Sequence, residues 1–145
     1  MSKKRSKATR KVFIETSVFI RFFTHDDAKK AVDCDRFFAK VEEGVIRPYV
    51  SSIVILEIIF VLTRLYKFPR IEVMNAIEKI LQLRNVTLIE KTNTSFALMW
   101  WGHASKQYGD CLIASQIPIG VALATYDQDF RSFPNLMPMT PGEIM

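Results

Sequence analysis

Four short apolar runs recur along the chain and alternate with longer segments of helical character. They are rich in Val, Ile and Leu, as buried strands are, and cover residues 12–14, 45–50, 86–89 and 121–125. Strands that alternate with helices usually pair in parallel, because each helix carries the chain back to the start of the next strand. This pattern predicts an α/β fold with a mainly parallel sheet of four to five short strands and helices on both faces. Residues 136–139 are the candidate edge strand, and Pro48 predicts an edge position or a weak strand for its own run.

Capping residues and apolar periodicity place the helices between these strands. Helices are expected over residues 18–24, 28–43, 51–66, 69–81, 92–106 and 110–115. Thr16 and Ser17 offer helix-start chemistry for the first of them, and Asp26 or Asp27 for the second. Ser51 or Ser52 can cap the long apolar third helix.

Length and charge define the organisation of the chain. Its 145 residues, 49% of them hydrophobic, fit one globular domain over residues 12–145. Residues 1–11 hold six of the twenty Lys and Arg residues and no acid, so the rest of the chain is close to neutral. This predicts a disordered basic tail that follows a phosphate backbone, or else a terminus that only aids solubility. Two isolated cysteines and no apolar run of membrane-spanning length favour a reduced, cytoplasmic protein without a membrane segment.

Four acidic residues lie where a carboxylate is costly. Each ends or interrupts an apolar segment, and they are Glu15, Glu57, Asp110 and Asp127. A buried charge without a partner costs several kcal/mol or takes up a proton. Since strand carboxyl ends gather at one edge of a parallel sheet, these acids predict a shared cation, most simply a metal ion.

Each acid also has an ordinary structural interpretation. Glu57 can lie on a solvent-facing side of its helix, although its neighbours three and four residues away are all apolar. Asp110 can be a helix N-cap, and Asp127 and Asp129 can be turn residues. Glu15 can simply end a strand.

The order of these acids within short motifs resembles a known family. The chain has Glu-Thr-Ser after the first strand, Ser-Ser-x4-Glu at a helix start, Gly-Asp-Cys-Leu-Ile-Ala, and then Thr-Tyr-Asp-Gln-Asp-Phe. Over residues 12 to about 138 this resembles a PIN-domain nuclease of the VapC toxin type. The resemblance implies a metal site and catalytic centre of Glu15, Glu57, Asp110 and Asp127, with Asp129 as a further metal ligand. It also implies that Ser17 and Thr125 orient water or metal.

The resemblance implies a divalent-metal-dependent endoribonuclease, the toxin of a type II toxin–antitoxin pair, with a small antitoxin partner and a homodimeric state. Carboxylate oxygens without His or Cys favour Mg²⁺ or Mn²⁺. Candidate RNA-binding residues are Arg21, Lys106 and Arg131. Trp100 and Trp101 are either a base-stacking platform or packing residues of a helix or dimer interface.

Glu15 departs from the family pattern, which has Asp at this position. The extra methylene is expected to weaken catalysis, so that Glu15→Asp would raise the rate of cleavage. The alternative function is a PIN-like module that binds RNA or a partner without cleaving it. A phosphotransfer domain is a third class, but it requires an Asp nucleophile where this chain has Glu15.

Overall fold

The computed structural model describes residues 9–103 and 106–144 and contains one five-stranded sheet. The strands are β1 (Arg10–Ile14), β2 (Ile46–Ser51), β3 (Thr87–Ile89), β4 (Ala122–Ala124) and β5 (Pro138–Met139). All neighbours pair in parallel, in the order β3-β2-β1-β4-β5. The predicted α/β fold with a parallel sheet is confirmed, including an edge position for β5.

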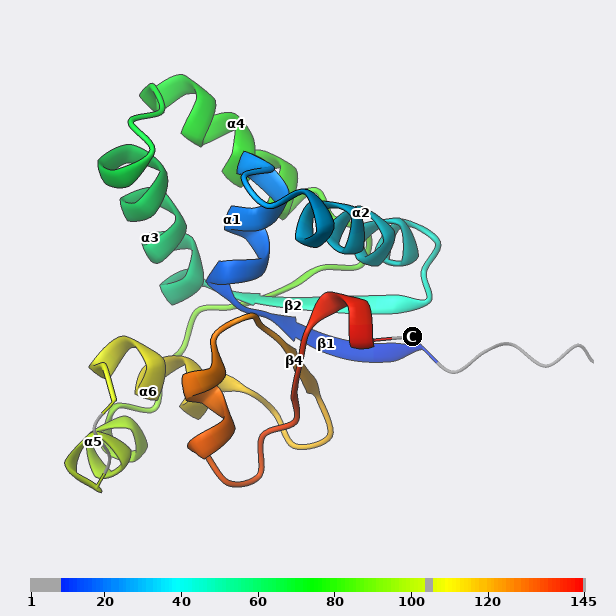
Figure 1. The fold of residues 1–145 in the computed structure, drawn as a ribbon. Coiled ribbons are helices and arrows are strands. Elements are labelled where there is room, and N and C mark those ends of the chain that lie inside the picture. The colour runs from blue at the N-terminus through cyan, green and yellow to red at the C-terminus, as the bar shows by residue number, and fades with distance from the viewer. Residues whose placement is uncertain (1–8, 104–105, 145) are drawn as a thin grey trace, which may run out of the picture.

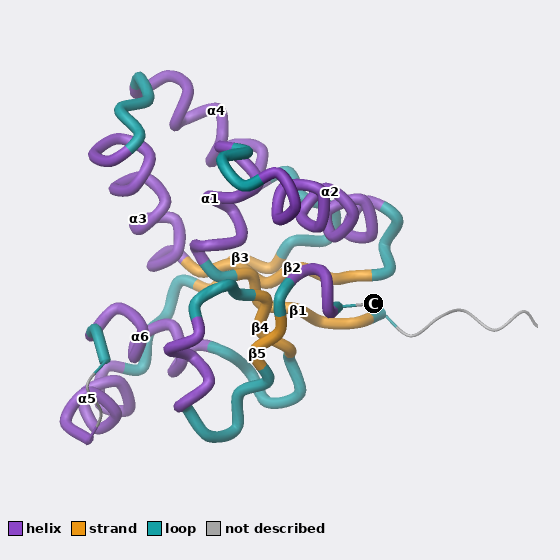
Figure 2. The backbone as a smooth tube through the Cα atoms, viewed as in Figure 1, coloured by secondary structure: helices purple, strands orange, loops and turns teal. Residues whose placement is uncertain are grey.

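Helices cover both faces of the sheet, so the domain has three layers (Figures 1 and 2). One layer contains α1 (Thr16–Thr24), α2 (Ala28–Glu42), α3 (Ser52–Phe60) and α4 (Arg70–Leu81). The opposite layer contains α5 (Thr94–His103), α6 (Tyr108–Gln116) and the short 3₁₀-helix η2 (Gln128–Ser132). The buried core lies between the layers, with Phe13, Ile14 and Leu123 of the central strands fully buried. No helix of the described residues is long and apolar enough to cross a membrane.

Helix starts follow the capping chemistry, with one difference. The side chains of Asp27 and Ser51 accept hydrogen bonds from the backbone N–H groups of Lys30 and Val54, as expected of N-caps. The first helix, however, begins at Thr16 and is capped by Glu15, whose side chain accepts from the Ser17 N–H. The expected start at residue 18 was wrong, because a strand-end carboxylate supplies the cap.

The long apolar helix changes its hydrogen-bond pattern midway. After α3 the chain continues as the π-helix η1 (Val61–Leu65), and a left-handed Lys67 precedes the turn into α4. A second 3₁₀-helix, η3 (Pro141–Glu143), follows β5 and packs against α2. The helix predicted over residues 92–106 is present as α5, whose described residues are Thr94–His103.

The edge position predicted from Pro48 was wrong. β2 lies inside the sheet, between β1 and β3. Its pairing with β3 begins only at Tyr49, so the half of the strand that contains Pro48 has β1 as its sole described neighbour. A proline is tolerated in this half of the strand because its β3 side has no described strand that would need a backbone donor.

β1 begins earlier than the sequence suggests. Arg10 and Lys11 pair with Ile46 and Arg47, so they belong to the sheet and not to the basic tail. The remainder of the predicted tail, residues 1–8, lies outside the described residues.

Candidate metal and active site

The strand order reverses direction at β1. From β1 the chain moves to β2 and β3, and it later returns to β4 on the other side. In parallel sheets of this kind, ligands bind at the carboxyl ends of the strands on either side of the reversal. Ile14 is in register with Ala124 there, and the Glu15 N–H donates to the Ala124 carbonyl at 3.0 Å. Glu15 and Thr125 therefore lie side by side at the switch point.

The side chain of Glu15 is held by residues from both strand ends. Its Oε1 accepts the Ser17 N–H at 3.1 Å, the Ser17 hydroxyl at 2.6 Å and the Thr125 hydroxyl at 2.6 Å. Ser17 Oγ also accepts the Tyr126 N–H at 2.9 Å. Burial raises the pKa of Glu15, while the hydrogen bonds from Ser17 and Thr125 act in the opposite direction. Ser17 and Thr125 thus fix the carboxylate while its Oε2 accepts no hydrogen bond from a described residue.

Glu57 reaches the site from α3. Its Oε1 accepts the hydroxyl of Thr16, the residue after Glu15. Its Oε2 faces the start of α6 so closely that a Cβ at Gly109 would lie 2.9 Å away. Burial, and then the neighbouring Asp127, raise the pKa of Glu57. Its half-buried position between α1 and α6 rules out the solvent-facing interpretation.

Three aspartates form the tightest cluster of carboxylates among the described residues. Asp110, Asp127 and Asp129 each offer one oxygen, and these oxygens lie within 4.8 Å of one another. Asp127 is the N-cap of η2 and accepts the Asp129 N–H at 2.9 Å, while its own N–H donates to Thr125 Oγ1. Asp110 lies in the first turn of α6, whose N-cap is Gln107, so the N-cap interpretation of Asp110 is excluded.

The environment of Asp110 disfavours a negative charge. Burial raises its pKa to about 7, and the neighbouring carboxylates of Asp127, Glu57, Glu15 and Asp129 contribute to the same shift. Crowded, partly desolvated carboxylates gain stability when a cation is bound between them.

The donor atoms fit a hard divalent cation. The three clustered aspartates offer carboxylate oxygens only, the ligand type that Mg²⁺ and Mn²⁺ prefer. Glu15 and Glu57 border this cluster without belonging to the set of mutually close oxygens. The five predicted acids are therefore gathered at one place, with three in mutual reach and two beside them.

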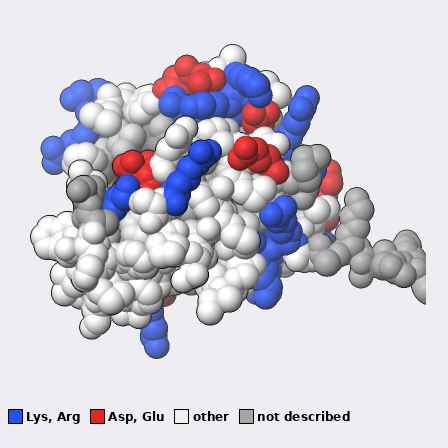
Figure 3. Space-filling model, turned by 60° about the horizontal axis from the view of Figure 1, so that its bottom comes forward, with Lys and Arg blue, Asp and Glu red and all other residues white. Residues whose placement is uncertain are grey.

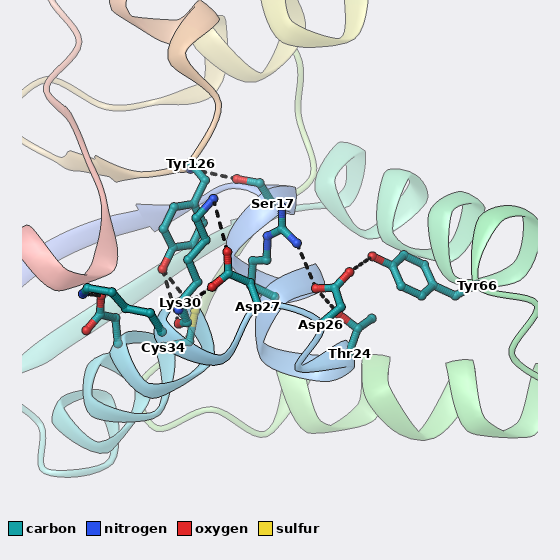
Figure 4. Close-up of polar contacts among 11 residues, drawn as sticks. Ser17, Thr24, Asp26, Asp27, Lys30, Cys34, Tyr66 and Tyr126 are labelled. Carbon is teal, nitrogen blue, oxygen red and sulfur yellow. Dashed lines mark hydrogen bonds and ion pairs between the residues drawn. The ribbon is translucent and has the colours of Figure 1, made fainter.

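The three basic candidates differ in their surroundings. Lys106 Nζ lies 3.9 Å from Asp129 Oδ1, and its side chain is only 16% exposed. Arg131 lines a small hollow together with Thr125 and Asp127. Arg21 is engaged elsewhere, because its Nη1 donates to Asp26 at 2.8 Å, and Asp26 also accepts the hydroxyl of Tyr66 (Figure 4). Lys106 and Arg131 thus both lie beside members of the acidic cluster, and Lys106 forms an ion pair with one of them.

Tyr126 is a site residue that sequence reasoning did not single out. It lies between Thr125 and Asp127, and its hydroxyl donates to the Lys30 carbonyl at 3.4 Å and contacts Cys34 Sγ at 3.7 Å (Figure 4). Lys30 Nζ also lies 4.8 Å from the centre of its ring. These contacts tie the end of β4 to α2 and so position Asp127. An aromatic residue between the polar residues Thr125 and Asp127 was the available signal.

The family model of the PIN domain matches residues 12–136, and the chain therefore belongs to the PIN domain family. No curated protein sequence matches the chain. Several solved structures share the fold at low sequence identity.

Two of these structures carry the name VapC or VapBC. VapC20 of Mycobacterium tuberculosis, titled a sarcin–ricin loop cleaving toxin, has a TM-score of 0.65 at 16% identity, covering 86% of this chain and 96% of its own. VapBC2 of Rickettsia felis, solved with a DNA fragment from its promoter, has a TM-score of 0.60 at 16% identity, covering 90% and 98%. PAE2754 of Pyrobaculum aerophilum has a TM-score of 0.60 at 13% identity, covering 90% and 83%. At these identities the likeness establishes a shared fold.

Proposed function

We propose that the protein is a divalent-metal-dependent endoribonuclease that hydrolyses phosphodiester bonds of RNA. The observation that carries this proposal is the cluster of Asp110, Asp127 and Asp129 at the topological switch point of a PIN domain. Mg²⁺ or Mn²⁺ held by these aspartates would neutralise their charge and supply a Lewis acid for the phosphate together with an activated water.

The chain's own residues have separate roles in this proposal. Asp110, Asp127 and Asp129 hold the cation, and Ser17 and Thr125 keep Glu15 fixed beside it. Glu57 accepts the proton of the attacking water, because burial raises its pKa and it stands outside the three-aspartate cluster. Lys106 lies where it can offset the charge of an incoming phosphate.

The second part of the proposal is that the enzyme is the toxin of a type II toxin–antitoxin pair. The support is the fold that the chain shares with VapC20 and with VapBC2. The structure of VapBC2 includes a DNA fragment from its promoter. The expected partners are a small antitoxin protein and a second copy of the chain. A cytoplasmic location is expected for such a protein.

The direct test is incubation of the purified protein with a panel of RNAs in Mn²⁺, in Mg²⁺ and in chelator. We expect cleavage with either ion and none with chelator. Asp127→Asn should lower the single-turnover rate by at least about 10²-fold, since it removes a ligand at the reacting centre. Asp26→Asn, a carboxylate outside the site, is the matched control and should cleave at the parental rate. Cleavage that persists in chelator would contradict the proposal.

A binding module without catalysis is the second candidate, and the position of Glu15 favours it. Its carboxylate lies outside the set of mutually close oxygens and is engaged by two hydroxyl groups. Metal-dependent RNA binding without cleavage, in the same panel, would support this candidate over the nuclease.

A further inference from the structure

Thr16 is a buried polar residue to which the reaction proposed above gives no role. It is the first residue of α1, it lies between Glu15 and Ser17, and it is only 7% exposed. A buried hydroxyl group has lost its hydrogen bonds to water and needs a partner within the protein. The partner here is Glu57 Oε1 on α3, which accepts the Thr16 hydroxyl at 2.5 Å from a position 41 residues further along the chain. The two helices are therefore joined by a direct polar contact at the candidate site.

Thr16 is the only residue among 9–103 and 106–144 that donates a hydrogen bond to the side chain of Glu57. On the face shown in Figure 3, several Asp and Glu side chains lie next to a Lys or Arg side chain, whereas Glu57 belongs to no described ion pair. Its second oxygen, Oε2, faces Gly109 and accepts no hydrogen bond from the described part of the chain. The orientation of a long and flexible side chain therefore depends on one hydroxyl group.

The position of Thr16 is itself well determined. The N–H of Glu15, the residue before it, donates to the Ala124 carbonyl at 3.0 Å. The hydroxyl of Ser17, the residue after it, accepts the Tyr126 N–H at 2.9 Å. A β-branched side chain such as that of Thr16 also has few conformations at the start of a helix. The Thr16 hydroxyl is thus fixed relative to the end of β4, from which the chain continues into the aspartate cluster.

We propose that Thr16 is the positioning residue for Glu57. Its hydroxyl holds Oε1, so that Oε2, which faces the start of α6, stays directed at the place where the attacking water gives up its proton. This inference rests on the proposed ribonuclease function, in which Glu57 accepts that proton. A proton acceptor must lie within hydrogen-bond reach of its target, and small displacements of a reacting group slow a reaction strongly.

The first test is single-turnover cleavage, at saturating Mn²⁺, of the RNA that the parent cleaves in the panel described above. Thr16→Val removes the hydroxyl and should lower the rate at saturating RNA roughly 10-fold, while the RNA concentration that gives half the maximal rate stays unchanged. Thr16→Ala should show the same loss, because it removes the hydroxyl without placing a methyl group there. Thr16→Ser keeps the hydroxyl and should cleave like the parent. The matched control is Thr24→Val, on the same helix, whose hydroxyl donates to the Ile20 carbonyl away from the site.

The second test repeats Thr16→Val in a chain that carries Glu57→Gln. If Thr16 acts through Glu57, the loss should shrink to about 2-fold or less once the proton acceptor is gone. A loss as large as in the parent would overturn the inference, since it would show that Thr16 supports the site in some other way. A Thr16→Ser variant as slow as Thr16→Val would also overturn it, because the hydroxyl would then not be the feature that matters.

Metal-free crystal structures of the parent, Thr16→Val and Thr16→Ser give a readout that does not depend on activity. The Glu57 carboxylate should leave its position beside Gly109 in Thr16→Val and keep it in Thr16→Ser. An unmoved Glu57 in Thr16→Val would overturn the inference. If the parent cleaves RNA and Thr16→Val cleaves at the same rate, only this inference fails. If the parent cleaves no RNA but Glu57 moves as expected, Thr16 still positions Glu57 and the ribonuclease proposal fails.

Discussion

Asp26 and Asp110 are acidic residues of one small domain, and their surroundings shift their pKa values in opposite directions. Asp26 accepts hydrogen bonds from Arg21, Thr24 and Tyr66, and these partners, with Tyr66 first and Arg21 next, lower its pKa to about 2. Asp110 is half-buried among other carboxylates, and its pKa is raised to about 7. The first carboxylate fastens the α1–α2 connection to the end of η1 (Figure 4). The second has its charge unbalanced by the fold, as expected of a residue whose partner comes from outside.

The largest expected effect concerns the response of these two residues to metal. At a Mn²⁺ concentration of about 100 Kd, binding to the native state adds about 2.7 kcal/mol, which raises the Tm of a domain of this size by about 5–10 °C. Asp110→Asn should remove most of this rise, whereas Asp26→Asn should keep it. Without metal, Asp110→Asn should be no less stable than the parent, because one repelling charge is gone. The measurement is the Tm of each variant in Mn²⁺ and in chelator. A full metal-dependent rise in Tm for Asp110→Asn would show that Asp110 is not a metal ligand.

Glu15 is an intermediate case, because the chain's hydroxyl groups hold it while one oxygen remains available. The contacts of Glu15 favour a different prediction from the expectation that Glu15→Asp raises activity, which remains untested. Shortening the side chain withdraws the carboxylate by roughly 1.5 Å from a cluster that it only borders, and it strains the hydrogen bonds from Ser17 and Thr125.

We therefore expect Glu15→Asp to slow single-turnover cleavage at saturating Mn²⁺ by about 10-fold, a misplacement cost. Glu15→Gln keeps the length and removes the charge, so it should lose both metal affinity and activity. A faster Glu15→Asp enzyme would show that the native Glu is a handicap to which the site has not adapted.

The two aspartates should also give stability opposite dependences on pH. For Asp26 the folded pKa of about 2 lies below the usual 3.8, so its stabilising contribution is present above pH 3.8 and is lost as the pH falls toward 2. For Asp110 the folded pKa of about 7 lies above 3.8, so metal-free stability falls as the pH rises from about 4 to 7.

Denaturation of the metal-free protein across these two windows tests both signs. Asp110→Asn should reduce the change in stability between about pH 4 and 7, and Asp26→Asn should reduce the change below pH 3.8. If the upper slope is the same in Asp110→Asn as in the parent, the carboxylate of Asp110 is not the group that titrates.

The smallest effect is expected at the basic N-terminus, which has cations and no acid to balance. Since Arg10 and Lys11 belong to β1, the informative truncation removes residues 1–8 only. If this segment contacts phosphates, its loss should weaken RNA binding and reduce the log–log salt slope by roughly 0.7 for each contact. Cleavage at saturating RNA should be unchanged. An identical salt slope after truncation would assign the segment to solubility.

The sequence predicted the elements better than their contacts. Apolar runs and capping residues indicated the parallel sheet and the caps at Asp27 and Ser51, because those signals act over a few neighbouring residues. Tertiary contacts decided the rest. The capping of α1 by Glu15 depends on a strand end that also meets Thr125, a residue 110 positions away in sequence. Pro48 is tolerated in an interior strand because the pairing of β2 with β3 begins only at Tyr49.

The same distinction holds for the candidate site. Family resemblance pointed to all five acids, and the structure gathers them at one sheet edge. The resemblance could not indicate that Arg21 forms an ion pair with Asp26, or that Lys106 lies near Asp129. Both contacts depend on side-chain placement. Tyr126 was missed because its role comes from contacts with α2, which no local pattern records.

Gly109 leaves room for a carboxylate of the candidate site. The residue lies within α6, where alanine is favoured over glycine by up to about 1 kcal/mol, so the backbone alone gives no reason for a glycine. The reason is the Glu57 carboxylate, 2.9 Å from where a methyl group would project. We expect that one added carbon at residue 109 displaces the end of the Glu57 side chain, so that Gly109→Ala folds but loses activity in the RNA cleavage assay. For the toxin proposed above, such a substitution would be a single-step route between a harmful and a harmless product of the same gene.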